Sequence, residues 1–215
     1  MKFIAALSLI GSAAALNLPT FGKPAKVAAP APKMLTIDAL PGALPPVGLF
    51  DPLDFAGKAT PDTLRRYREA ELTHGRVAML AVIGFLVGEA VEGSSFLFDA
   101  QITGPAISHF FQVPAEFWFS LTLGIAALEW TRAEKLFVPP SEVPLGQAGL
   151  MILDSTPGDI GFDPLGLKPE DPEELAVLQT KELQNGRLAM LAAAGFLAQE
   201  AVNGKGIVET LQGYF

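Results

Sequence analysis

The chain has 215 residues, of which 50% are hydrophobic and 18% are charged, and its formal net charge is −8. It contains no cysteine, which excludes disulfides and thiolate metal sites. The acidic balance gives no support for nucleic-acid binding. The functional clues must therefore come from how apolar and polar residues alternate along the chain.

The N-terminal segment has the pattern of a two-part targeting sequence. Residues 1–16 carry Lys2, then an apolar run, and end in small residues of the kind found at cleavage sites, which is typical of a cleavable signal peptide. Residues 17–34 contain three lysines and no acidic residue, as transit peptides do. We therefore expect an organelle reached through the secretory route, and a folded domain over 35–215. A secreted protein with a flexible linker is the alternative.

The remaining chain predicts three long helices separated by loops rich in proline and glycine. A helix start is indicated by Thr60-Pro61 and a helix stop by Gly93 or Gly204. In chain order, the expected elements are a loop over 40–55, a helix over 61–91, a loop with room for a short surface helix over 94–113, a helix over 114–135, a helix over 172–202 and a short amphipathic end after residue 206.

An internal duplication relates the first and third helices. Residues 71–92 and 182–203 are identical at 14 of 22 positions, and each copy follows a Phe-Asp-Pro-Leu loop, at 50–53 and 162–165. Agreement at this level indicates a repeat. Each copy opens an otherwise apolar helix with a Glu, a polar residue three positions later and an Arg two positions beyond that.

The three helices are expected to cross a membrane. Their charge-free cores, Val77–Gly88, Phe117–Leu128 and Leu188–Gln199, are 12 residues each, whereas a span needs about 20. Extending them requires polar residues in the apolar layer, where such residues normally pair or serve a function. In a three-span arrangement the basic helix ends fall on one side, as the positive-inside rule predicts; these are Arg65, Arg66, Arg68, Arg132, Lys135 and Lys181. The predicted fold is all-α, with three transmembrane helices and short amphipathic surface helices.

The duplicated charges suggest how the first and third helices pack. Glu71 and Arg76 are five residues apart and point in different directions on one helix, whereas residues that pair within a helix are three or four positions apart. If the two helices cross about a pseudo-twofold axis, Glu71 meets Arg187 and Glu182 meets Arg76. Small residues in both helices, including a Gly-x-x-x-Gly over 84–88, would permit a close approach.

The same positions offer separate ligands for a hard metal ion. A carboxylate oxygen of either glutamate suits magnesium, His74 offers an imidazole nitrogen and Asn185 an amide oxygen. The sequence shows no converging set of ligands for a protein metal cluster. Single ligands on apolar helices suit a cofactor that brings four ligands of its own, such as a chlorin or a porphyrin.

The paired motifs resemble those of the light-harvesting complex superfamily. Glu-x-x-His-Gly-Arg and Glu-x-x-Asn-Gly-Arg, each followed by Ala-Met-Leu after one residue and preceded by Phe-Asp-Pro-Leu, look most like the fucoxanthin–chlorophyll a/c proteins of the red lineage. The resemblance covers roughly residues 40–205. It implies a plastid thylakoid location, chlorophyll a, chlorophyll c and fucoxanthin or a related xanthophyll. Implied partners are a photosystem I or II core, neighbouring antenna subunits and membrane lipid, with no nucleic acid.

The resemblance also implies roles for particular residues. The chlorophyll magnesium ligands would be Glu71, His74, Glu182, Asn185, Gln199 and Glu129. The ends of two carotenoids would lie at loops formed by Phe50, Asp51, Pro52, Phe162, Asp163 and Pro164. The sequence departs from the family pattern at three places. Gly88 is the first-helix counterpart of Gln199 and has no side chain to coordinate a metal ion. Ser120 and Leu121 stand where many relatives have a Gln, and the C-terminal tail lacks the His that many relatives use as a chlorophyll ligand. Glu129 also has Arg132 as an ordinary ion-pair partner.

The expected function is a light-harvesting antenna that passes excitation to a photosystem and catalyses no reaction. One alternative is a photoprotective member of the same family, in which Glu89, Glu92 and Asp99 sense lumen pH. Another, from a different class, is a small ion or proton transporter that uses the buried Glu/Arg pairs. Glu89 and Glu200 are themselves repeated and are expected at the far membrane surface.

Overall fold

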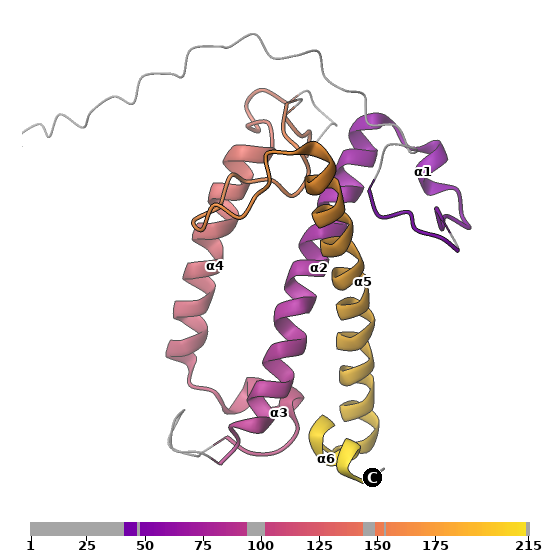
Figure 1. The fold of residues 1–215 in the computed structure, drawn as a ribbon. Coiled ribbons are helices and arrows are strands. Elements are labelled where there is room, and N and C mark those ends of the chain that lie inside the picture. Colours follow the sequence, from indigo (N-terminus) through magenta and orange to yellow (C-terminus); the bar gives the residue numbers. More distant parts are fainter. Residues whose placement is uncertain (1–40, 47, 94–101, 144–148, 153, 214–215) are drawn as a thin grey trace, which may run out of the picture. The chain divides into compact units, whose positions relative to one another are not determined.

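A computed structural model describes residues 41–46, 48–93, 102–143, 149–152 and 154–213. The predicted signal (1–16) and transit (17–34) segments lie outside the described residues. The described residues all belong to one compact unit, Pro32–Phe215, and they contain helices but no strand (Figure 1). The helices are α1 (Phe55–Lys58), α2 (Pro61–Ala90), α3 (Ala106–Gln112), α4 (Ala115–Leu136), α5 (Pro172–Asn203) and α6 (Ile207–Gln212).

The two long helices begin where the sequence predicts. The Thr60 side chain accepts a hydrogen bond from Thr63 N at 3.3 Å, and the Asp171 side chain accepts one from Glu173 N at 3.3 Å. Each bond satisfies one backbone N–H that the first helical turn leaves without a partner. α5 ends at Gly204, whose φ of 63° closes the helix in the left-handed region. The single turn of α1 and its position in the lead-in loop were not predicted.

α2 and α5 cross at a pair of repeat-related glycines. A Cβ built on Gly75 would lie 3.0 Å from the Cα of Gly186, and one built on Gly186 would lie 3.0 Å from the Cα of Gly75. The two backbones therefore touch, which only glycine permits. The reciprocal distances fit the predicted pseudo-twofold crossing. The buried side chains that flank it are the repeat-related pairs Leu72 with Leu183 and Ala78 with Ala189.

The predicted packing role of the Gly-x-x-x-Gly segment is wrong. A Cβ on Gly84 would meet no described atom within 4 Å, and one on Gly88 would meet the His109 ring, not α5. The helices have already diverged at this level, because the crossing lies more than two turns earlier. The small-residue pattern alone does not specify which of its members forms the contact.

The short helices exchange partners between the repeats. Glu89 on α2 accepts hydrogen bonds from Ile207 N (2.7 Å) and Val208 N (2.8 Å) at the start of α6. Glu200 on α5 accepts one from Ile107 N (2.7 Å) at the start of α3. Each long helix thus caps the short helix that follows the other long helix. The two repeated glutamates fix the helix ends away from the arginine-rich end.

The middle helix, α4, is attached mainly at its C-terminal end. Leu136 is fully buried, and its carbonyl accepts a hydrogen bond from Ile152 N at 2.8 Å. Val138 N donates to Leu150 O at 2.9 Å. Along the rest of α4 apolar side chains stand exposed, Phe119 at 73% for example. In Figure 1, α4 runs beside α2 and α5 without the close crossing that joins those two.

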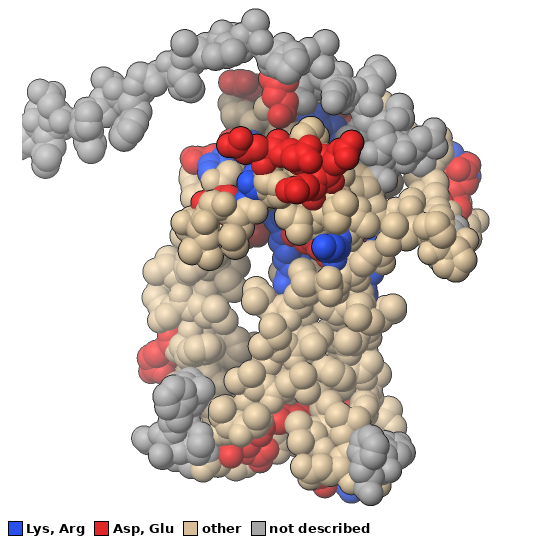
Figure 2. Space-filling model, viewed as in Figure 1, with Lys and Arg blue, Asp and Glu red and all other residues tan. Residues whose placement is uncertain are grey.

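Only part of the predicted membrane arrangement is evident from length and composition. Among the described residues α2 alone is long and apolar enough to span a bilayer, and α3 with α4 meets the same criterion only as one broken span bent by 103°. α5 does not, because Arg187 and the adjacent Gln199 and Glu200 bracket its apolar core. On the face shown in Figure 2, charged side chains gather toward the two ends of the helices and leave an uncharged band between.

Candidate functional site

Two reciprocal ion pairs join the crossed helices. Arg187 Nε lies 2.7 Å from Glu71 Oε1, and Arg76 Nε lies 2.7 Å from Glu182 Oε1. All four side chains are partly covered, with exposed fractions from 28% to 40%. These are the pairs that the duplication suggested, and each glutamate finds its arginine in the other repeat.

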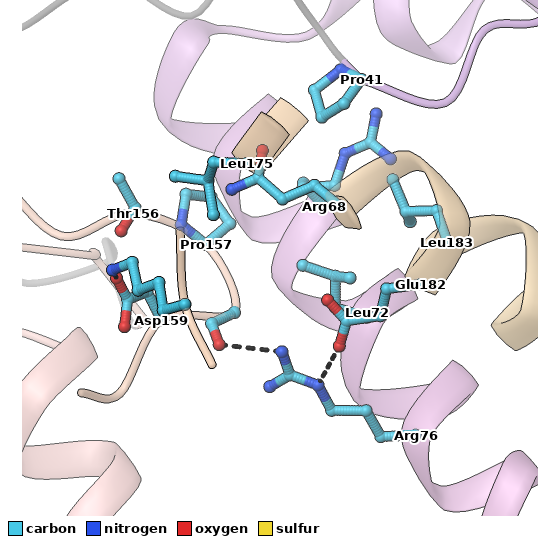
Figure 3. Close-up of a pocket in the computed structure, with 13 residues that line it drawn as sticks. Pro41, Arg68, Leu72, Arg76, Thr156, Pro157, Asp159, Leu175, Glu182 and Leu183 are labelled. Atoms are coloured by element: carbon cyan, nitrogen blue, oxygen red, sulfur yellow. Dashed lines mark hydrogen bonds and ion pairs between the residues drawn. The ribbon is translucent and has the colours of Figure 1, made fainter. Parts of the chain in front are cut away.

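Each of these arginines also holds a backbone carbonyl of the opposite repeat. Arg76 donates to Gly158 O at 2.9 Å (Figure 3), and Arg187 donates to Gly42 O at 2.8 Å. Both glycines follow a proline and have positive φ, 81° for Gly158 and 98° for Gly42. The repeat therefore extends to a Pro-Gly turn ahead of each Phe-Asp-Pro-Leu loop. Two acceptors fix the plane of each guanidinium, which suits its fork of donors.

The two glutamates differ in how completely they are paired. Arg68 Nη1 lies 3.0 Å from Glu71 Oε2, so both oxygens of Glu71 face a cation. Glu182 Oε2 has no hydrogen-bond partner among the described residues, which leaves it open to a metal ion. A carboxylate has about four lone-pair sites, so Glu71 also retains acceptor capacity.

His74 and Asn185 present a free ligand atom to the outside of the helix pair. His74 Nδ1 lies 2.7 Å from Ala70 O, and Asn185 Nδ2 lies 2.8 Å from Lys181 O. A carbonyl only accepts, so Nδ1 is the donor, and in the neutral imidazole Nε2 then carries the lone pair that could ligate a metal ion. The same bond in Asn185 leaves Oδ1 free. A hydrogen bond on the other nitrogen is how proteins orient a metal-ligating histidine, and the two copies share this arrangement.

A third Glu/Arg pair lies on α4. Arg132 Nη1 is 2.6 Å from Glu129 Oε2, and Arg132 Nε is 3.0 Å from Oε1 of Glu69 on α2. The side chain of Glu129 is 55% exposed, whereas that of Glu69 is only 3% exposed. The expected ordinary ion pair of Glu129 is therefore present, and it leaves Glu129 Oε1 without a partner among the described residues.

Gln199 faces a partly covered position toward the other end of α5. Its Nε2 atom is buried and has no hydrogen-bond partner in the described part of the chain. A buried amide nitrogen without an acceptor is costly, and the atom of this side chain that could ligate a metal ion is the oxygen Oε1. It lies about 21 Å along the helix from Asn185.

The Phe-Asp-Pro-Leu loops form two similar surfaces. Asp51 accepts hydrogen bonds from Phe55 N and Ala56 N, and Asp163 accepts them from Leu167 N and Lys168 N, at 2.6–3.0 Å. These bonds stabilise the carboxylates, and the pKa of each Asp is lowered, chiefly by the N–H of Ala56 for Asp51 and of Lys168 for Asp163. The apolar side chains beside them stand open; Phe50, Leu53, Phe162 and Leu165 are 66–78% exposed.

A cavity of about 350 Å³ lies next to the Arg76–Glu182 pair (Figure 3). Its lining combines Leu72 and Leu183 with Arg68, Pro157 and Lys168. Among the described residues no group of three His, Asp or Glu side chains is placed to hold a metal ion by itself. The residues fit separate, single-ligand coordination of cofactors that supply their own remaining ligands.

Sequence reasoning missed three parts of this site. The Pro-Gly turns at 41–42 and 157–158 could have been found, because the dipeptide recurs ahead of both loops. Gly75 and Gly186 are repeated as well, but their repetition does not by itself distinguish a helix contact from the neighbouring ligand and ion-pair residues. Glu69 has no counterpart, since Thr180 occupies the equivalent position, and no pattern in the sequence distinguishes it from a solvated helix residue.

Comparison with known proteins places this geometry in context. The model of the family described as "Chlorophyll A-B binding protein" matches residues 36–201. The chain is 47% identical over 191 residues to light-harvesting complex stress-related protein 1 of Chlamydomonas reinhardtii, covering 86% of this chain and 74% of that protein. It is 47% identical over 166 residues to a fucoxanthin-chlorophyll a-c binding protein of Isochrysis galbana, covering 77% of each. Identity to a photosystem I chlorophyll a/b-binding protein of Arabidopsis thaliana is 32% over 185 residues, covering 81% and 66%.

Proposed function

The chain belongs to the chlorophyll a-b binding family of light-harvesting proteins, and we propose that it is a three-span thylakoid antenna whose crossed helices hold chlorophyll and carotenoid. The relatives named above are chloroplastic proteins, in agreement with a plastid location. α2, α5 and α4 preceded by α3 are the three spans of this proposal.

The outward ligand atoms of His74 and Asn185 carry the proposal. Each sits on the exposed side of a crossed helix with its other polar atom already bonded to a carbonyl four residues earlier. Bound chlorophyll supplies light absorption and excitation transfer. The protein fixes the position and orientation of each ligand atom, so that spacings between pigments are set by helix geometry.

Glutamates of the crossed helices also serve as magnesium ligands in this proposal, and their negative charges are neutralised by arginines. Glu71 and Glu182 place a carboxylate oxygen at the surface of the helix pair, and Arg187 and Arg76 cancel the charge. Glu129 with Arg132 repeats this arrangement on α4. We assign Glu71, Glu182, Glu129 and Gln199 as further magnesium ligands, and the exposed phenylalanines of the two Phe-Asp-Pro-Leu loops as contacts for carotenoid ends.

The finer identity of pigments and partners is inferred from the relatives. The fucoxanthin-chlorophyll a-c binding relative supports chlorophyll c and fucoxanthin in addition to chlorophyll a. The relatives that carry photosystem I or CP29 in their names support association with a photosystem and with neighbouring antenna subunits. Membership of this family favours pigment binding over the ion-transporter alternative.

The decisive experiment is an absorption spectrum and pigment extract of the purified protein. Chlorophyll and a xanthophyll bound in fixed ratio are expected. A protein purified from the thylakoid without colour would refute the proposal and favour the transporter. The His74→Leu and Asn185→Leu variants should each lose about one chlorophyll, and unchanged ratios in both would refute these two ligand assignments.

A photoprotective role is the second candidate, and one structural observation favours it. Glu200 is 2% exposed, its Oε1 accepts no hydrogen bond from any described residue, and Glu89 and His109 lie beside it. Two carboxylates offer each other only acceptors, so a proton shared between them would supply the missing donor. Of the acids expected to sense pH, Glu89 is part of this pair, Glu92 bonds Gly104 N at 2.6 Å, and Asp99 lies outside the described residues.

The two roles predict different responses to acid. A dissipating protein should lower its chlorophyll fluorescence lifetime on acidification, and Glu200→Gln should reduce that response without changing pigment content. A lifetime that is constant with pH in the unmodified protein would leave only the antenna role.

A further inference from the structure

Glu69 is the most thoroughly bonded acidic side chain at the arginine-rich end. Its exposed fraction is 3%. Oε1 accepts from Arg132 Nε at 3.0 Å, Oε2 accepts from Gly158 N at 2.5 Å, and the Thr73 hydroxyl lies 3.4 Å from Oε1. This one carboxylate therefore connects α2, α4 and the turn at 157–158.

Arg132 divides its guanidinium between two glutamates. Nε bonds the buried Glu69, and Nη1 bonds the exposed Glu129 at 2.6 Å. An exposed pair three residues apart on a helix is weak and samples several geometries when it stands alone. Arg132 lies one turn before Leu136 at the attached end of α4, and its bond to Glu69 fixes the guanidinium, and through it Glu129, against α2.

The other two proposed ligand glutamates are also held by an arginine that has a second acceptor. Arg187 holds Glu71 and is itself fixed by Gly42 O, and Arg76 holds Glu182 and is fixed by Gly158 O. In each case the arginine has a second acceptor on another segment of the chain. For Arg132 that second acceptor is a side chain instead of a carbonyl.

We propose that Glu69 is a positioning residue for the chlorophyll held by Glu129: it orients Arg132, which orients the Glu129 carboxylate that ligates magnesium. The inference rests on the proposed ligand role of Glu129. Glu69 touches no pigment in this proposal and acts only through Arg132. Because Gly158 N bonds Glu69 while Gly158 O bonds Arg76, one residue, Gly158, joins the Glu129 site to the Glu182 site.

The test uses the full chain reconstituted with extracted pigments. In Glu69→Gln the amide can accept only through its oxygen, so either Arg132 or Gly158 N loses its acceptor. We expect loss of one chlorophyll per protein, with the same missing absorption and circular-dichroism bands as in Glu129→Leu and the remaining pigments at full occupancy. Glu134→Gln is the matched control, since Glu134 is an exposed α4 carboxylate whose only hydrogen bond among the described residues is from the Trp130 indole at 2.8 Å.

The outcomes separate the inference from the function on which it rests. If Glu129→Leu keeps every chlorophyll, Glu129 is not a ligand and the proposed role of that residue fails. If Glu129→Leu loses one chlorophyll and Glu69→Gln loses none, Glu69 is not the positioning residue. If Glu69→Gln lost all pigments to the same extent, Glu69 would have a general structural role, and this result would also overturn the inference.

A second variant keeps the inference testable if Glu69→Gln does not fold. Glu69→Asp keeps the buried charge but is one methylene shorter, so it cannot reach both Arg132 and Gly158 N. It should fold and should weaken or shift the same chlorophyll bands that Glu129→Leu removes. Bands identical to those of the unmodified protein would refute the positioning role.

Discussion

The two repeat-related arginines should differ in importance, although they form equivalent ion pairs. In Arg187→Leu, Glu71 keeps Arg68 at 3.0 Å and Gly42 O keeps Gln184 Nε2 at 3.1 Å. In Arg76→Leu no described cation remains within 4 Å of the Glu182 carboxylate, and no other described side chain donates to Gly158 O. The Glu71–Arg187 site thus contains replacements that the Glu182–Arg76 site lacks.

Magnitudes follow from the burial of the pairs. Breaking a fully buried pair costs about 3–5 kcal/mol, and the partial exposure here lowers that value. We expect Arg76→Leu to cost about 3 kcal/mol, and Arg187→Leu, with Arg68 still in place, about 1.5 kcal/mol. For a chain of this length these costs correspond to Tm decreases of about 6–12 °C and about 3–6 °C respectively.

The assay is thermal denaturation of the reconstituted protein, followed by the circular dichroism of its pigment bands, with pigment ratios measured on the same samples. Arg76→Leu should lose the chlorophyll on Glu182, whereas Arg187→Leu should only lower the occupancy of the one on Glu71. If Arg187→Leu reduced Tm and pigment content as much as Arg76→Leu, the compensating role of Arg68 would be wrong. If neither variant changed them, the reciprocal pairing itself would be unimportant.

Three further predictions follow from the same structure. Gly75→Ala should destabilise the protein by about 1–3 kcal/mol, because its Cβ would press on the Gly186 backbone; Gly84→Ala, which points into open space, is the control in the thermal melt and should be neutral. Asn185→Leu should lower the chlorophyll count by about one and leave the thermal stability nearly unchanged, and equal loss of all pigments would contradict this. The pKa of Asp163 is lowered from 3.8 by the loop N–H groups, so its carboxylate stabilises the fold above about pH 4 and this contribution disappears as the pH falls further. The Tm difference between the unmodified protein and Asp163→Asn should therefore shrink between pH 6 and pH 3, and a difference that grew would refute the reasoning.

The sequence predicts the long helices and their crossing because those features depend on local or duplicated signals. Thr60 and Asp171 are capping residues followed by proline, and the repeated Glu and Arg are five residues apart, so they cannot pair with each other within one helix. Charges without a local partner in an apolar helix require a distant one, so the reciprocal pairs follow from electrostatics and symmetry.

The remaining features depend on contacts that the sequence does not encode locally. Gly84 and Gly75 are equally plausible crossing points from spacing, and only the backbone path selects Gly75. The burial of Glu69 arises from the approach of α4 and of the turn at 157–158, which belong to segments more than 60 residues away. The caps formed by Glu89 and Glu200 require knowing that each short helix lies beside the opposite long helix.

The exchange of bonds between the repeats has a consequence for biogenesis. α2 emerges first and carries Glu71 and Arg76, while their partners on α5 lie 116 and 106 residues later in the chain. An unpaired charge in the bilayer interior costs several kcal/mol, and among the described residues Arg76 has its acidic partner only on α5, so α2 alone is a poor membrane helix despite its length. In the proposed membrane arrangement the two helices must enter the bilayer together, already crossed. A chain truncated after α4 should therefore fail to integrate stably into the membrane.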